Sequence, residues 1–236
     1  VHAFSGQASQ PLSLAAADLD EDGMPDLVAG FADLRLGASP QSSTVSGGFL
    51  TLHRGNVEAV YLTSPPLPTT PPPFLSPARV LALPAAPDFL GTGDLDGDGH
   101  LDVVLAARDN ATLYLLPGDG KGGFRPAQPI PLPGTVTALA VGDVNRPDGL
   151  ADVVVGIAGE DGPQALVFEG PQGALRSQPE VFSLHMAATA LAIGQLDDDY
   201  PLDLAIAAGN HLLVVHGRDR KTALSPEQRS NVLSAI

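Results

Sequence analysis

The sequence predicts an all-β protein, built as a β-propeller of four-stranded antiparallel blades. Three observations lead to this prediction. The 26 Gly and 23 Pro residues favour turns and short elements, aromatic residues make up only 5% of the chain, and one acidic pattern recurs four times along the 236 residues. Because 44% of the residues are hydrophobic, the chain can bury a sizeable core, and we expect a single domain over residues 1–236.

The repeated pattern places an acidic loop before a buried strand. Its four copies are ADLDEDGMPDLVAG (17–30), GDLDGDGHLDVVLAA (93–107), GDVNRPDGLADVVVGIAG (142–159) and GQLDDDYPLDLAIAAG (194–209). An apolar run precedes each copy, and a further apolar run ending in a glycine turn follows it, as in TLYLLPGDG (112–120). The loop therefore joins the first strand to the second in every unit, as expected of propeller blades. A β-sandwich is the alternative, but it does not require a polar loop at one fixed place.

The spacing of the repeats sets apart two regions of the chain. The acidic loops begin 76, 49 and 52 residues apart, and the excess in the first interval lies within residues 37–78. That range contains the proline-rich run TSPPLPTTPPP (63–73), which we interpret as a surface insertion or a partner-docking arm. The tail TALSPEQRSNVLSAI (222–236) predicts either a short helix or the outer strand of the fourth blade.

Charge and cysteine content exclude several functions. Twelve basic residues against 27 acidic ones give a formal charge of -15, which argues against binding to nucleic acid or to an anionic membrane surface. No apolar run approaches the roughly 20 residues that a membrane-spanning helix needs. The chain has no cysteine, so disulfides, thiolate metal sites and cysteine nucleophiles are excluded.

The acidic loops predict a cation. Asp94, Asp96 and Asp98 alternate with other residues in DLDGDGHLD, and His100 is the only basic residue within that stretch. Carboxylates held this close repel one another, so we expect a metal ion to balance them. Oxygen ligands spaced around a glycine turn suit Ca²⁺ better than Mg²⁺. An EF-hand would need Glu at position 12 and flanking helices, but Leu105 occupies that position and the flanks are strands.

The repeats resemble the FG-GAP or VCBS family, the blades of integrin-α-type propellers. The stretches FLGTGDLDGDGHLDVVLAA (89–107) and ALAVGDVNRPDGLADVVVGIAG (138–159) carry the resemblance. In that family the side chains at loop positions 1, 3, 5 and 9, with the carbonyl at position 7, hold Ca²⁺. Family propellers usually close with seven blades, so about four blades imply further blades from the same polypeptide or from a partner subunit, or else a propeller that closes with few blades.

The resemblance implies a ligand set for each loop. The first loop offers Asp18, Asp20, Asp22, Asp26 and the Met24 carbonyl, and the second offers Asp94, Asp96, Asp98, Asp102 and the His100 carbonyl. The third, with one inserted residue, offers Asp143, Asn145, Asp148, Asp152 and the Leu150 carbonyl. In the fourth, Gln195 replaces the first Asp and Tyr200 replaces the glycine, leaving Asp197, Asp199 and Asp203. We therefore expect three Ca²⁺ ions, and a fourth only if this altered loop still binds.

The expected function is non-catalytic. A calcium-stabilised propeller that binds a protein or a glycan in adhesion fits the pattern, in an extracellular, cell-surface or periplasmic setting where millimolar Ca²⁺ fills weak sites. The alternative is an accessory or catalytic propeller of a secreted polysaccharide lyase or phospholipase-type enzyme. The sequence contains neither GxSxG nor HExxH, and we interpret His211 and His216, which flank the strand LLVV, as ordinary turn residues.

Overall fold

The computed structural model describes residues 9–33, 47–60, 71–144, 149–170, 172–198 and 200–217. Within these ranges nearly all regular structure is strand. Two short helical turns are present, α1 (Val57–Val60) and the 3-10 turn η1 (Ala174–Arg176). No helix in these ranges has the length and apolar character needed to cross a membrane.

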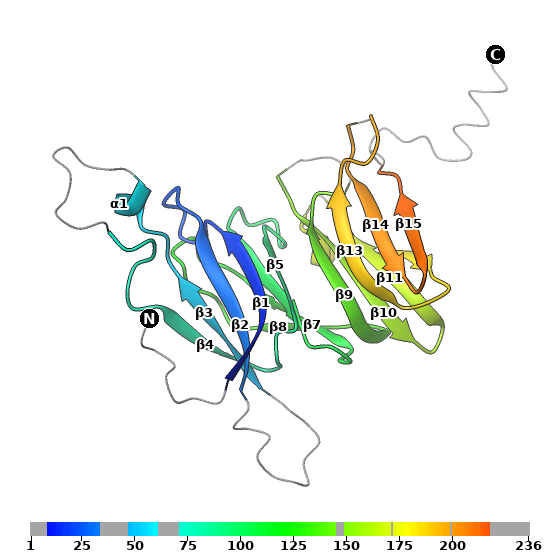
Figure 1. Cartoon of the computed structure of the whole chain (residues 1–236), viewed down its shortest axis with the longest axis horizontal. Helices are drawn as coiled ribbons and strands as arrows, with labels where there is room; N and C mark the ends of the chain where they lie inside the picture. Colours follow the sequence, from blue (N-terminus) through cyan, green and yellow to red (C-terminus); the bar gives the residue numbers. More distant parts are fainter. Residues whose placement is uncertain are drawn as a thin grey trace, which may run out of the picture.

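The strands form four antiparallel sheets in chain order, here called blades 1 to 4 (Figure 1). Blade 1 contains β1 (Ser9–Ala17), β2 (Asp26–Asp33), β3 (Gly48–His53) and β4 (Arg79–Leu83). Blade 2 contains β5 (Phe89–Gly93), β6 (Asp102–Ala106), β7 (Thr112–Leu116) and β8 (Gln128–Pro131). Blade 3 contains β9 (Gly134–Gly142), β10 (Asp152–Gly159), β11 (Gly162–Phe168) and β12 (Glu180–Ser183). Blade 4 contains β13 (Ala188–Gly194), β14 (Asp203–Ala208) and β15 (His211–Val215).

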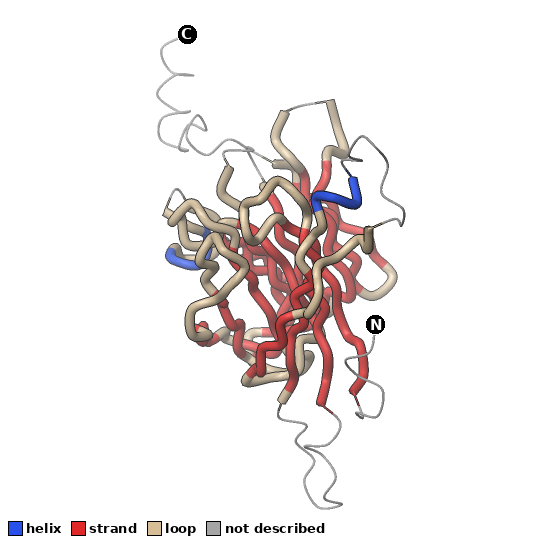
Figure 2. The backbone as a smooth tube through the Cα atoms, turned by 90° about the vertical axis from the view of Figure 1, so that its left-hand side faces the viewer, coloured by secondary structure: helices blue, strands red, loops and turns tan. Residues whose placement is uncertain are grey.

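The blades stand side by side, and their first strands line one edge of the stack. Strand β1 contacts β5, β5 contacts β9, and β9 contacts β13. Figure 1 shows the four sheets following one another across the molecule, and Figure 2 shows the strands running between two ends that carry the loops. This is the propeller-type arrangement that the sequence predicts.

The second strand of a blade is apolar throughout because its side chains point alternately to the two neighbouring blades. In β6, Val103 and Leu105 pack on blade 1 while Val104 and Ala106 pack on blade 3. In β10, Val154 packs on blade 4 and its neighbours Val153 and Val155 pack on blade 2. Since successive side chains of a strand point to opposite faces, a strand between two neighbouring sheets must be apolar on both. The sequence prediction of strands buried on both faces is confirmed for these two blades.

Blade 4 is apolar on both faces, but the described residues cover only one of them. Leu191, Leu204 and Ile206 pack toward blade 3. The residues between them face the other way, and cross-strand pairing aligns them in two rows: Ala190, Ala207 and Leu212, then Ala192, Ala205 and Val214. Leu212 is 70% exposed and Val214 is 43% exposed. We call these six residues the far face of blade 4.

The extra length of the first repeat is not one continuous segment. Strand β3 and helix α1 lie inside the range 37–78, so the additional residues are divided between the two sides of β3. The tail 222–236, for which the sequence leaves a helix or a strand open, lies outside the described residues.

Candidate metal centres

The acidic loops join the first and second strands of each blade and lie next to one another. The Ala151 N–H of the third loop donates to the Asp94 carbonyl oxygen of the second at 3.2 Å. The His100 Nδ1 of the second loop lies 2.6 Å from Glu21 Oε1 of the first, and this hydrogen bond raises the pKa of His100. The first three loops therefore contact one another in chain order at one end of the blades.

In three of the four blades, the aspartate that ends the acidic loop holds three strands together. Asp102, at the start of β6, accepts the Leu95 N–H at 2.9 Å and the Gly118 N–H at 2.8 Å. Leu95 is the second residue of the loop after β5, and Gly118 follows β7. One carboxylate thus ties the first, second and third strands of blade 2. We call this arrangement the aspartate clasp.

The same clasp recurs in blades 1 and 4. Asp26 accepts from Leu19 N at 3.1 Å and Gly55 N at 2.8 Å. Asp203 accepts from Leu196 N and Gly217 N, both at 2.9 Å. In blade 3, Asp152 accepts from Val144 N at 2.9 Å. The ninth loop position, which the sequence assigns to metal binding, therefore has a structural role within the protein itself.

A glycine is required on the other side of the clasp. A Cβ on Gly118 would lie 2.1 Å from the Leu101 carbonyl oxygen, and one on Gly217 would lie 2.2 Å from that of Leu202. These distances are far inside van der Waals contact, so no larger residue fits without moving the backbone. The close approach brings the glycine N–H within reach of the carboxylate.

The second loop gathers three buried carboxylates. Oxygens of Asp94, Asp96 and Asp102 lie within 4.8 Å of one another. Asp94 Oδ1 accepts the Gly97 N–H at 2.8 Å and its Oδ2 accepts the Gly99 N–H at 3.0 Å, which fixes the turn. Burial, followed by repulsion from Asp96 and Asp98, raises the pKa of Asp102 to about 6. Three acidic groups in this environment favour a bound cation.

The first loop contains an unpaired buried oxygen. Asp18, Asp20 and Asp22 bring carboxylate oxygens within 4.8 Å of one another. The Asp20 side chain is only 3% exposed, and its Oδ1 is one of two buried side-chain oxygens in the described part of the chain that lack a hydrogen-bond partner. A buried acceptor without a donor is costly, so this site fits a cation. Asp26 lies outside this group and serves the clasp.

Arginines from distant parts of the chain also reach the loops. Arg54 pairs with Asp20, Arg125 with Asp98, and Arg176 lies 3.4 Å from Asp96. The expectation that only His100 and a metal ion balance the second loop is therefore wrong. The sequence reasoning looked only within the loop, whereas the turn after β7 and the turn η1 bring Arg125 and Arg176 to it.

The third and fourth loops are described in part. Asn145, Asp148 and Asp199 lie outside the described residues. Asp143 and Leu150 lie in the loop between β9 and β10, and Asp152 is the first residue of β10. Gly149 has φ 90, matching φ 88 at Gly23 and φ 89 at Gly99, which also stand three residues before a clasp aspartate. In the fourth loop, Asp197 and Asp203 form a group with His216, a residue that the sequence reasoning set aside.

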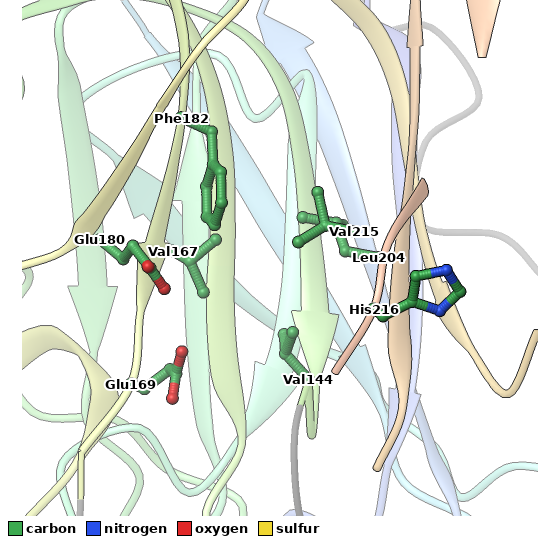
Figure 3. A pocket seen from close by; sticks show the side chains of 8 residues that line it. All are labelled: Val144, Val167, Glu169, Glu180, Phe182, Leu204, Val215 and His216. Carbon is green, nitrogen blue, oxygen red and sulfur yellow. The ribbon is translucent and has the colours of Figure 1, made fainter. Parts of the chain in front are cut away.

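A pocket lies beside the fourth loop, between blades 3 and 4 (Figure 3). Val144, Val167, Phe182, Leu204 and Val215 form its apolar lining. Glu169 and Glu180 border it on one side, and His216 lies on the other with its ring turned away from them.

Comparison with known proteins supports the repeat and the fold. Residues 94–155 match the model of the FG-GAP-like repeat, so the chain carries a repeat of this kind. The crystal structure of BBS1N in complex with ARL6DN, soaked with lead, is similar with a TM-score of 0.50 at 14% sequence identity. The similarity covers 86% of this chain and 52% of that one, so this chain spans about half its length. No curated protein matches.

Proposed function

We propose that the chain is a calcium-stabilised, non-catalytic propeller domain that works outside the cytosol by binding a protein or a glycan. The observation that carries the calcium proposal is the side chain of Asp20. Its buried Oδ1 has no hydrogen-bond partner, and the neighbouring carboxylates of Asp18 and Asp22 have no proton to donate to it. Arg54 pairs with the other oxygen of Asp20. A single guanidinium cannot neutralise three carboxylates, so a divalent cation would complete the site.

The donors present suit Ca²⁺. The groups Asp18, Asp20, Asp22 and Asp94, Asp96, Asp102 supply only carboxylate oxygens, and Ca²⁺ takes six to eight oxygen ligands. When bound, the ion would neutralise the loop and strengthen the hairpin that the loop joins. We propose Kd values like those of extracellular modules, roughly 10⁻⁴ to 10⁻³ M, so the sites would fill in an extracellular, cell-surface or periplasmic setting.

Thermal unfolding with EDTA or with 10 mM Ca²⁺ tests the calcium sites. From the affinities above, Ca²⁺ at about ten to a hundred times Kd should add about 1–3 kcal/mol per site and raise Tm by several degrees. Asp20→Asn should lose the contribution of one site. Asp161→Asn removes the same charge at an exposed turn between β10 and β11 and should keep the full Ca²⁺ effect. Equal Tm values in EDTA and Ca²⁺ would refute the proposal.

The far face of blade 4 supports a role in binding. Its apolar residues repeat the pattern by which the other blades pack on one another, and Leu212 and Val214 project from it into solvent. Large exposed apolar patches mark interaction sites. We infer that this face receives a further β-sheet, supplied by the same polypeptide or by a partner subunit.

Glycan arrays combined with turnover assays separate binding from catalysis. A non-catalytic binding domain should retain a glycan or protein ligand and release no product from it. Product release from an acidic polysaccharide or a phospholipid would instead show an enzyme of the lyase or phospholipase type.

A further inference from the structure

The fourth loop combines an imidazole with two carboxylates. His216 Nδ1 lies 2.8 Å from Asp197 Oδ2 and 3.4 Å from Asp203 Oδ1. One donor atom from each of the three residues lies within 4.8 Å of the others. In the described part of the chain, this is the one group of potential metal ligands that contains a nitrogen donor.

The clasp of blade 4 positions these donors. Asp203 is fully buried, and N–H groups of Leu196 and Gly217 fix both of its oxygens. His216 directly precedes Gly217, so the hydrogen bond that locates Gly217 also brings the imidazole to the loop. Figure 3 shows the His216 ring turned away from Glu169 and Glu180, the acidic residues of the neighbouring pocket.

The donor set favours a transition metal over Ca²⁺. Gln195 replaces the first carboxylate of this loop and Tyr200 replaces its glycine, so two features of the calcium loops are absent. Imidazole nitrogen suits Zn²⁺, whereas Ca²⁺ prefers oxygen ligands alone. Bonds of about 2.0–2.2 Å to a tetrahedral Zn²⁺ place ligand atoms roughly 3.4 Å apart. His216 Nδ1 lies 3.4 Å from Asp203 Oδ1, and its 2.8 Å ion pair with Asp197 Oδ2 would lengthen when the metal binds.

We propose that Asp197, Asp203 and His216 form a Zn²⁺ site in blade 4. Three protein ligands leave the fourth tetrahedral position to water or to a ligand of the domain. The site has its own donors and does not depend on Ca²⁺ in the first two loops.

Calorimetric titration of Zn²⁺ into the full chain, saturated with Ca²⁺, tests the proposal. One Zn²⁺ should bind per chain. His216→Ala should weaken this binding at least about tenfold, since changes in outer-shell residues alone have effects of that size. The matched control is His211→Ala, which removes the exposed histidine at the other end of β15 and should bind Zn²⁺ normally.

Two further measurements make the result decisive. Co²⁺ in place of Zn²⁺ should give visible absorption bands of a tetrahedral site, and His216→Ala should remove them. A cooperative thermal transition of His216→Ala in EDTA would show that the variant folds. Absence of Zn²⁺ binding, or equal binding by His216→Ala and His211→Ala, would overturn the zinc site. The calcium proposal is tested separately, by the difference in Tm between EDTA and Ca²⁺.

Discussion

The second and fourth acidic loops share a clasp but differ in what surrounds it. Asp102 and Asp203 each start the second strand of a blade and each accept two backbone N–H groups. Around Asp102 lie further carboxylates, whereas Asp203 lies beside His216. The clasp persists in the fourth loop although Gln195 and Tyr200 replace two residues of the calcium pattern there, so the clasp does not depend on that pattern.

The surroundings shift the two pKa values in opposite directions. Burial, aided by Asp96 and Asp98, raises the pKa of Asp102 to about 6. The hydrogen bond from Gly217, joined by that from Leu196, lowers the pKa of Asp203, and His216 adds to this shift. A cation at the second loop would therefore relieve an unfavourable ionised Asp102, whereas the ionised form of Asp203 in the fourth loop is already favoured.

The largest expected effect concerns how the contribution of Asp102 to the free energy of unfolding changes with pH, and how Ca²⁺ alters that change. Without metal, folded Asp102 keeps its proton up to about pH 6, whereas the unfolded chain loses it near pH 3.8. Its contribution to stability is therefore complete below pH 3.8 and lost as pH rises through 6, with a change of at most about 3 kcal/mol. Ca²⁺ favours the ionised form and should abolish or reverse this trend.

Urea unfolding between pH 4 and 7 measures the effect as the difference between the unchanged protein and Asp102→Asn. In EDTA that difference should follow the trend above, and in Ca²⁺ it should not. The counterpart Asp203→Asn should remove a contribution of opposite sign, because a lowered pKa stabilises above 3.8 and is lost as pH falls. The same pH trend for Asp102 in EDTA and Ca²⁺ would contradict a cation at this loop.

A smaller loss of stability, expected in both blade 2 and blade 4, follows from replacing the glycine whose N–H donates to the clasp aspartate. Gly118→Ala and Gly217→Ala each force a Cβ onto a carbonyl oxygen and should lower the free energy of unfolding by about 1–3 kcal/mol. For Gly217→Ala the loss should be the same in EDTA and in Ca²⁺, because the fourth loop lacks the calcium pattern. Gly194→Ala, whose Cβ would meet nothing within 4 Å, is the control and should change stability far less. A neutral Gly217→Ala would show that the clasp does not support blade 4.

The sequence predicted those features that depend on local pattern. Strands β6 and β10 follow from continuous apolar runs after an acidic loop, and the positions of Asp94 and Asp96 follow from their spacing. Arg54, Arg125 and His216 could not be assigned to the loops, because only the folded blade brings the turn after its third strand back to the loop. The clasp role of Asp102 was also hidden, since its N–H partners lie 7 and 16 residues away.

The far face of blade 4 should also affect the solubility of the polypeptide. Four alanines, Leu212 and Val214 form a surface without a charged group, on a protein that otherwise carries a formal charge of -15. Net repulsion keeps such molecules apart at low salt, and screening removes that protection. The solubility of the isolated chain should therefore fall as ionic strength rises, and the far face of blade 4 should contribute to that fall.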